Sequence, residues 1–273
     1  METGGYLNSL ESTEQLERMS RMVHFVGAGP GAVDLITVRG QQLLQQADVI
    51  IYAGSLVNPQ LLQWKKESCQ VYDSAYMTLE EVIAVMEQAE TEGKQTVRLH
   101  TGDPSIYGAI REQMDILEAK GIAFTSCPGV SSFCGAASAL NLEYTLPGIS
   151  QSVILTRMEG ATKVPAREQI EKLAAHRITM VLFLSTGMLS RLTERLTAGG
   201  YPPDTPAALV YKATWADEKK IVATLESLPE LAKKAGITKT ALIIVGDVVG
   251  KSGYEKSRLY AADFFTEYRK ASK

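Results

Sequence analysis

Three glycine-rich segments each follow a run of β-branched and apolar residues and are candidates for binding a ligand through their main chain. In open α/β sheets, ligands bind beyond the carboxyl ends of the strands, where loops expose backbone groups. The segments are Gly27-Ala28-Gly29-Pro30-Gly31-Ala32, Thr101-Gly102-Asp103-Pro104-Ser105-Ile106-Tyr107-Gly108 and Cys127-Pro128-Gly129-Val130-Ser131-Ser132-Phe133.

The first segment has the spacing of a dinucleotide-binding loop, but its context argues against one. A dinucleotide site needs a carboxylate at the end of the second strand for the ribose hydroxyls. Here Asp48 precedes that strand, which ends in Tyr52-Ala53-Gly54. Pro30 also removes an amide hydrogen where phosphate oxygens would need donors. A nicotinamide-dependent oxidoreductase is therefore disfavoured, and a glycine-rich turn without a ligand stays open.

The other two segments carry polar groups suited to a small polar ligand. The Asp103 carboxylate suits ribose hydroxyls or an ammonium group, and its alternative is a cap for the following helix. Ser131 and Ser132 offer hydroxyls and amides to a carboxylate, and their alternative is an ordinary helix cap. Residues 184–187 and 211–214 follow later strands in the same way, although each alone is more typical of a plain loop.

Hydrolytic, phosphoryl-transfer and metal chemistry have no visible machinery in this sequence. We find no Ser/His/Asp arrangement, no closely spaced pair of carboxylates and no Walker loop. The three cysteines have no CxxC spacing, so neither a disulfide framework nor a zinc site is expected. His24, His100 and His176 lie far apart in the sequence. We expect hydrogen-bonded structural histidines and no metal.

Alternating strand and helix patterns must position these loops, and they predict an α/β fold with largely parallel or mixed sheets. Thr78 and Glu81 form a capping box, and Gly93 and Gly121 end two helices. We expect an extension over 1–21, an N-terminal α/β domain over 22–146 and a C-terminal α/β domain over 147–273. Strands are expected near 22–27, 48–53, 69–73, 96–101, 123–127, 152–157, 179–185, 206–212, 219–225 and 241–249. Helices are expected near 36–46, 78–92, 108–120, 131–140, 166–175, 188–198, 227–235 and 257–270, the last one amphipathic.

The charge and apolar content of the chain argue against nucleic acid and membranes as its partners. The 273 residues carry a net charge of −3, which gives no general attraction to nucleic acid or to an anionic membrane. The apolar runs are far shorter than the roughly 20 residues that cross a bilayer. Residues 1–21 contain four glutamates and no apolar stretch, unlike a secretory signal. We expect a cytoplasmic protein.

Taken in this order and spacing, the three glycine-rich segments resemble those of the tetrapyrrole methyltransferases, and the similarity extends from about Val23 to Val249. The resemblance implies two α/β domains, a homodimer, and S-adenosylmethionine bound between the domains and converted to S-adenosylhomocysteine. It implies cofactor contacts at Pro30, Thr101, Gly102, Asp103, Ile106, Ser131, Ser132, Leu184, Thr186, Tyr211, Ala213 and Leu242.

Two further stretches, 52–59 and 73–81, resemble the branch of the family that methylates C11 of precorrin-4 or its cobalt complex in corrin (cobalamin) biosynthesis. The uroporphyrinogen branch has an acid after the second-strand tyrosine, but Ala53 stands there and leaves no assigned general base. We expect Ala53–Pro59 and Asp73–Met77 to flank a substrate trough. The implied substrate contacts are Gly29, Asp34, Arg39, Ala53, Ser55, Arg111 and Arg157.

Several alternatives stay open. Each of the three arginines is, by itself, more typical of a solvated surface charge. Other members of the family act on uroporphyrinogen III or another precorrin, and the wider superfamily includes enzymes that methylate RNA or protein. The sequence also allows a carrier that binds a tetrapyrrole without turning it over.

Overall fold

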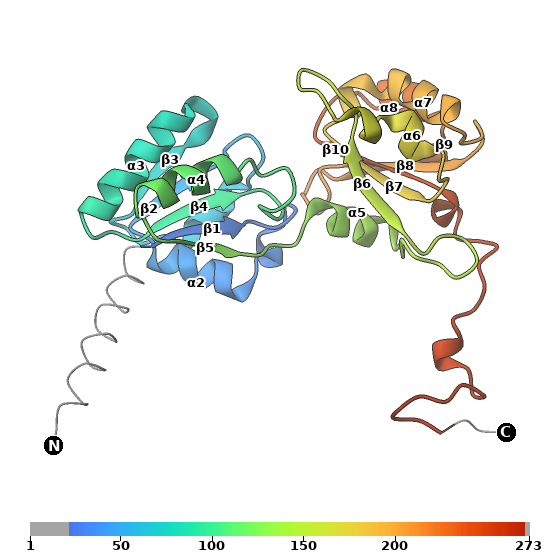
Figure 1. The fold of residues 1–273 in the computed structure, drawn as a ribbon, viewed down its shortest axis with the longest axis horizontal. Coiled ribbons are helices and arrows are strands. Elements are labelled where there is room, and N and C mark those ends of the chain that lie inside the picture. Colours follow the sequence, from blue (N-terminus) through green and yellow to red (C-terminus); the bar gives the residue numbers. More distant parts are fainter. Residues whose placement is uncertain (1–21, 271–273) are drawn as a thin grey trace. The chain divides into compact units, whose positions relative to one another are not determined.

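The computed structural model describes residues 22–270 (Figure 1). The expected extension over 1–21 lies outside the described residues. Contacts divide the chain into two compact units, the first running to Gly135 and including Thr214–Ala216, the second holding Ala136–Ala213 and the chain from Asp217 onward. The limits 22–146 and 147–273 stay a prediction about domains. Among residues 22–270, no helix has the length and apolar content needed to cross a membrane.

The first unit contains a five-stranded sheet in the order β3-β2-β4-β1-β5, in which all neighbouring strands are parallel. Its central strands are buried along their whole length, as expected of a sheet covered on both faces. Because the strands are parallel, their carboxyl ends and the loops after them lie at one edge. The strands are β1 (Val23–Gly27), β2 (Val49–Tyr52), β3 (Gln70–Asp73), β4 (Thr96–His100) and β5 (Phe124–Cys127).

Helices cover both faces of this sheet. One core cluster includes Leu44 of α2, and another includes Met86 of α3 and Leu117 of α4, so α2 lies opposite α3 and α4 (Figure 1). The capping box of Thr78 and Glu81 is confirmed by both reciprocal hydrogen bonds. The helices are α2 (Val38–Gln46), α3 (Leu79–Thr91) and α4 (Arg111–Ala119), with 3-10 turns η1 (Val33–Leu35), η2 (Pro59–Trp64) and η3 (Ser74–Tyr76). A further helix, α5 (Ser132–Leu140), begins in the first unit and continues into the second.

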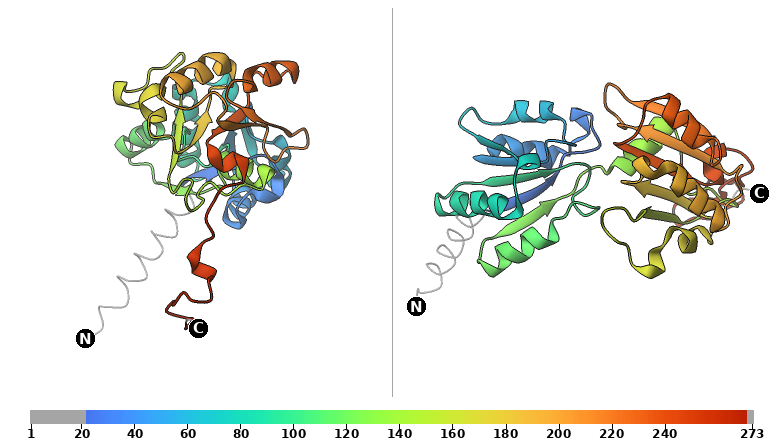
Figure 2. Two further views of the ribbon diagram at one scale, coloured as in Figure 1. Left: turned by 90° about the vertical axis from the view of Figure 1, so that its right-hand side faces the viewer. Right: turned by 90° about the horizontal axis from the view of Figure 1, so that it is seen from above.

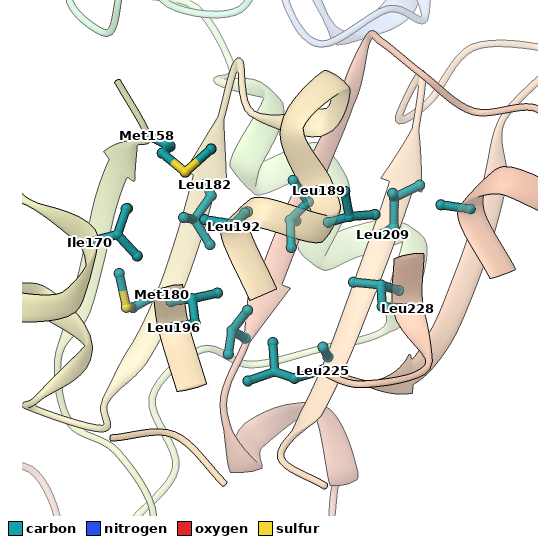
Figure 3. Close-up of a cluster of buried hydrophobic side chains, with 14 of the residues drawn as sticks. Met158, Ile170, Met180, Leu182, Leu189, Leu192, Leu196, Leu209, Leu225 and Leu228 are labelled. Atoms are coloured by element: carbon teal, nitrogen blue, oxygen red, sulfur yellow. The ribbon is translucent and has the colours of Figure 1, made fainter. Parts of the chain in front are cut away.

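The second unit contains a mixed five-stranded sheet in the order β6-β7-β10-β8-β9. β6 is parallel to β7, whereas β10 is antiparallel to both of its neighbours. Helices α6, α7 and α8 lie against this sheet (Figure 2), and their side chains pack on it in one apolar core (Figure 3). The elements are β6 (Val153–Arg157), η4 (Ala166–Glu168), α6 (Ile170–Ala174), β7 (Thr179–Phe183), η5 (Thr186–Met188), α7 (Leu189–Ala198), β8 (Pro206–Tyr211), β9 (Lys219–Thr224), α8 (Leu228–Lys234), β10 (Ala241–Val245) and η6 (Asp247–Gly250).

Two expectations near the C-terminal end need correction. The strand expected over 241–249 stops at Val245, because Gly246 has a φ of 135° and begins a 3-10 turn. The amphipathic helix expected over 257–270 is wrong, since only the short turn η7 (Arg258–Tyr260) forms there. Helices in proteins are stabilised mainly by packing of an apolar face. Most large apolar side chains of this segment are instead exposed, with Tyr268 at 94%.

Candidate functional site

The three glycine-rich segments meet at the carboxyl edge of the first sheet because glycines let their main chains touch. A Cβ on Gly27 would lie 2.5 Å from the Gly129 Cα and 2.6 Å from the Gly102 oxygen. Gly102 donates to the Gly29 oxygen at 2.8 Å, and Gly29 donates back at 3.2 Å. Larger residues at these positions would force the loops apart. The structure therefore brings together the segments that the sequence indicated separately.

The first glycine-rich loop has most of its backbone groups occupied by the protein itself. Ala28 donates to the His100 oxygen at 2.7 Å, and Ala32 donates to the Thr214 Oγ1 at 3.0 Å. Gly29 is bonded to Gly102, and Pro30 has no amide hydrogen. A pyrophosphate site needs several free amides directed at the ligand. This loop does not provide them, which adds to the argument against a nicotinamide cofactor.

Residues 214–216 come from the second half of the chain but pack on this loop as part of the first unit. The Trp215 Nε1 donates to the Pro30 oxygen at 3.1 Å. A Cβ on Gly31 would lie 2.1 Å from the Trp215 Cδ1, so the indole occupies the space beside that glycine. Our sequence analysis missed Trp215, because no local pattern indicates a contact between residues so far apart in the chain.

Asp103 ties two of the loops together. Its Oδ1 accepts from the Ser105 amide at 2.9 Å and from the Ser105 hydroxyl, and its Oδ2 accepts from the Gly129 amide at 2.9 Å. Burial by itself would raise the pKa of Asp103, but these hydrogen bonds outweigh it and lower the pKa below its usual value. The helix-cap alternative is wrong, since α4 begins after Ile110 without any side-chain cap.

Several residues that follow strand ends also have strained backbone conformations with positive φ values. Tyr107 and Ala109 follow β4 with φ values of 57° and 49°, and Leu184 follows β7 with a φ of 52°. Thr214, a β-branched residue after β8, has a φ of 71°. The left-handed region costs a non-glycine residue about 1 to 2 kcal/mol, and such residues concentrate at ligand-binding sites. The loops predicted to bind a cofactor therefore include strained positions in both units.

In the second unit, the remaining predicted cofactor residues lie around the start of β10. The Thr186 Oγ1 donates to the Ala241 oxygen at 2.9 Å, and Ala241 is paired in register with Tyr211. Leu242 is buried in β10, and Ala213 is buried just beyond β8. Leu184, in contrast, is 66% exposed.

The predicted substrate residues differ in exposure and in whether their side chains already have partners. Arg111 is exposed and pairs with Asp115 along its own helix, while Arg157 donates to the Thr162 and Lys163 carbonyls at 3.2 and 2.9 Å. Both guanidinium groups therefore already have local partners. Arg39 is exposed on α2. Of the others, Asp34 and Ser55 are exposed, Ala53 is half-buried and Gly29 is buried.

Exposed apolar side chains line the same edge of the first sheet. Val38, Leu56, Tyr76 and Tyr107 are 72%, 37%, 88% and 46% exposed. They follow β1, β2, β3 and β4, four strands that neighbour one another in the sheet. We call these four residues the apolar rim. Exposed apolar side chains on neighbouring segments are a common feature of surfaces that bind apolar ligands.

The buried histidines do not make the expected hydrogen bonds. Within residues 22–270, neither ring nitrogen of His24 has a partner, and the His100 Nε2 has none. Burial lowers the pKa of His24, and burial together with the charge of Arg98 lowers the pKa of His100 to about 3. Both rings are therefore neutral at neutral pH. Over the same described residues, no group of His, Cys, Asp and Glu is arranged to hold a metal ion.

Known proteins resemble this chain along nearly its whole length. A family model described as Tetrapyrrole (Corrin/Porphyrin) Methylases matches residues 22–229. A cobalt-precorrin-4 C(11)-methyltransferase from Methanocaldococcus jannaschii is 51% identical over 93% of this chain and 98% of its own length. The X-ray structure of a cobalamin biosynthetic cobalt precorrin-4 methyltransferase, 44% identical, has a TM-score of 0.83 and covers 85% of this chain and 97% of its own. A uroporphyrin-III C-methyltransferase from Thermus thermophilus, complexed with S-adenosylhomocysteine, is 26% identical with a TM-score of 0.71 and covers 85% of this chain and 100% of its own.

Proposed function

This chain belongs to the tetrapyrrole (corrin/porphyrin) methylases, and we propose that it transfers a methyl group from S-adenosylmethionine to C11 of precorrin-4 or its cobalt complex. The observation that carries the proposal is the 51% identity to a cobalt-precorrin-4 C(11)-methyltransferase over 98% of that enzyme's length. The likeness to uroporphyrin-III enzymes is weaker, at 26 to 32% identity. The Ala53 position agrees with this difference, since the uroporphyrinogen branch has an acid there.

In the first unit, the proposed cofactor contacts lie in the loops at the carboxyl edge of the parallel sheet. The close glycines Gly27, Gly102 and Gly129 let the main chains of the three loops pack against one another, which holds the loops together beside the proposed site. Ser131 is buried directly before α5, and its oxygen accepts from the Cys134 amide at 3.0 Å, which leaves the Ser131 side chain at the first turn of the helix. These features suit the polar groups of S-adenosylmethionine. The proposed contacts are Pro30, Thr101, Gly102, Asp103, Ile106, Ser131, Ser132, Leu184, Thr186, Tyr211, Ala213 and Leu242.

The chain's main task in this reaction is alignment. Bound S-adenosylmethionine supplies an electrophilic methyl group whose leaving group is a neutral thioether, so the protein needs no acid to assist departure. Holding two reactants in line can account for roughly 7 to 11 kcal/mol of the barrier. The apolar rim would support the face of the macrocycle, because flat conjugated rings pack on apolar and aromatic side chains.

The substrate's carboxylates need cationic partners. We propose Arg39, Arg111 and Arg157 for this role, with Gly29, Asp34, Ala53 and Ser55 as further contacts of the ring. Arginine matches carboxylates in geometry and keeps its charge. Arg111 would have to exchange its partner Asp115 for a substrate carboxylate, and because both side chains are more than 60% exposed, losing that ion pair costs little. We further propose that the enzyme acts as a homodimer in the cytoplasm.

One incubation tests the function directly. The chain is mixed with precorrin-4 or cobalt-precorrin-4 and a methyl donor labelled with ¹³C, and the product is examined by mass spectrometry and NMR. Label on C11 supports the proposal. Label on C2 or C7 of uroporphyrinogen III, or on an RNA ribose, would contradict it, and substrate binding without turnover would indicate a carrier. Tighter binding of NADH than of S-adenosylhomocysteine would favour an oxidoreductase.

A further inference from the structure

The ends of β2 and β3 lie side by side and place a carboxylate next to Ala53. Tyr52 and Asp73, the last residues of these strands, are paired in register. The Asp73 Oδ1 accepts from the Gly54 amide at 3.1 Å and from the Ala75 amide at 2.9 Å. A Cβ on Gly54 would lie 2.1 Å from the Asp73 Oδ2. The carboxylate therefore lies against the main chain of the residue that follows Ala53.

One oxygen of this carboxylate is not committed to the main chain. Both amide hydrogen bonds fall on Oδ1, which leaves Oδ2 available for another proton donor. Tyr52 is the register partner of Asp73, and burial, the charge of Asp73 and a hydrogen bond with its side chain raise the pKa of Tyr52. The phenol therefore stays neutral at neutral pH and donates to the carboxylate.

The surroundings of Asp73 indicate that a ligand on the apolar rim would cover it. Leu56 follows β2 and donates its amide to the Ala53 oxygen at 3.0 Å. Tyr76 ends the 3-10 turn that Asp73 caps. Both are exposed members of the apolar rim. Leu56 follows β2 and Tyr76 follows β3, the two neighbouring strands at whose ends Asp73 lies. Asp73 itself is half-buried, so a ligand can still reach it.

Methyl transfer to a ring carbon leaves a proton to be removed. The ring carbon supplies the electron pair of the new C–C bond, and the pair of the broken S–C bond stays on sulfur. A neutral macrocycle that gains a methyl cation becomes positively charged, and it returns to neutrality by losing a proton from an N–H or C–H of its conjugated system. That proton needs an acceptor, and Ala53 cannot be one.

We propose that Asp73 is the proton acceptor of this reaction and that Tyr52 holds its carboxylate in place. The inference rests on the proposed function. The carboxylate takes the proton released by the methylated ring and later passes it to water. Asp73, at the end of β3, thus supplies a carboxylate next to the end of β2, where residue 53 is an alanine and has no carboxylate.

Asp73→Asn separates this role from a structural one, because the amide oxygen can still accept from Gly54 and Ala75 while the negative charge is lost. Single-turnover transfer to precorrin-4 should slow by about 100-fold or more, the usual contribution of a general base. The affinity for S-adenosylhomocysteine should stay within about threefold, as for side chains away from the cofactor. Tyr52→Phe should slow transfer by a smaller factor.

Two further variants make the result decisive. Glu67→Gln removes an exposed carboxylate before the amino end of β3 and should leave the rate unchanged. Asp73→Ala should be slow, and added formate should restore part of its rate in a saturable way, which a purely structural defect would not allow. An Asp73→Asn rate within about threefold of the wild type would overturn the inference and reduce Asp73 to a turn cap. A wild-type chain that makes no C11 product would instead refute the proposed function, and this inference with it.

Discussion

Replacing Asp103 with alanine should weaken both the fold and the cofactor site. The substitution removes the acceptor for three hydrogen bonds, two from Ser105 and one from Gly129. It leaves the Gly129 amide without its partner, at the point where the loops after β4 and β5 meet. Hydrogen bonds to a charged group contribute about 1.5 to 3 kcal/mol each when buried. Asp103 is only half-buried and the three bonds are coupled, so they will not add fully.

We therefore expect the free energy of unfolding to fall by about 2 to 4 kcal/mol, and the binding of S-adenosylhomocysteine to weaken by about 1 to 3 kcal/mol. Urea denaturation and calorimetric titration measure the two quantities. Ser105→Ala is the matched control, because it removes only the hydroxyl donor and should cost about 1 kcal/mol of stability. Asp103→Asn should fall between the wild type and alanine, since its remaining oxygen can accept from Ser105 while its amide group loses the bond from Gly129.

The two measurements distinguish the roles of Asp103. If Asp103→Ala leaves stability within about 0.5 kcal/mol of the wild type, the contacts with Ser105 and Gly129 do not tie the loops as the structure indicates. If stability falls but the affinity per folded molecule is unchanged, Asp103 is a structural residue and does not contact the cofactor.

Four other changes test separate parts of the structure. Gly31→Ala should destabilise the protein by about 1 to 3 kcal/mol in urea denaturation, because its Cβ would overlap the Trp215 indole. If a double variant with Trp215→Leu recovers none of this stability, the overlap is not the cause. Ala53→Asp should leave S-adenosylhomocysteine affinity within about threefold and sharply slow single-turnover transfer, because it adds a second carboxylate beside Asp73; an unchanged rate would refute the reasoning. The pKa of Asp103 is lowered in the folded state, so its contribution to stability is present above about pH 4 and is lost as the pH falls further. In Asp103→Ala, the free energy of unfolding should therefore decrease less steeply than in the wild type as the pH falls below about 4. The single-turnover rate should vary little between about pH 6.5 and 8.5, because burial lowers the pKa of both buried histidines, that of His100 to about 3. A clear limb in that range would point to another titrating group.

Local patterns in the sequence were sufficient to predict most of the secondary structure. The capping box at Thr78 and the left-handed glycines Gly93 and Gly121 involve residues a few positions apart, so their signals lie in short windows. The helix expected over 257–270 shows the limit of such windows. Its apolar residues are spaced for a helix, but in residues 22–270 they have no surface to pack against.

The glycine-rich loops were found from the sequence, but the reason for their glycines was only partly foreseen. We expected these residues to admit a ligand. The structure shows that Gly27, Gly102 and Gly129 admit one another's main chains, and that Gly31 admits the Trp215 indole. Similarly, Asp103 was predicted as a ligand for a hydroxyl or an ammonium, and it is also the tie between two loops. A sequence records that a position is glycine or aspartate, and not which distant group shares its space.

By itself, the sequence determined the alternation of strands and helices, the position of the loops at strand ends and the resemblance to one family, because each of these depends on residues near one another in the chain. Only the tertiary structure decided that Asp73 lies beside Ala53, that Thr214 and Trp215 pack on the first loop, and that four apolar residues share one edge. These neighbours are set by the strand order β3-β2-β4-β1-β5 and by the passage of residues 214–216 into the first unit. Strand order depends on how whole elements pack into a common core, and no short stretch of sequence contains that information.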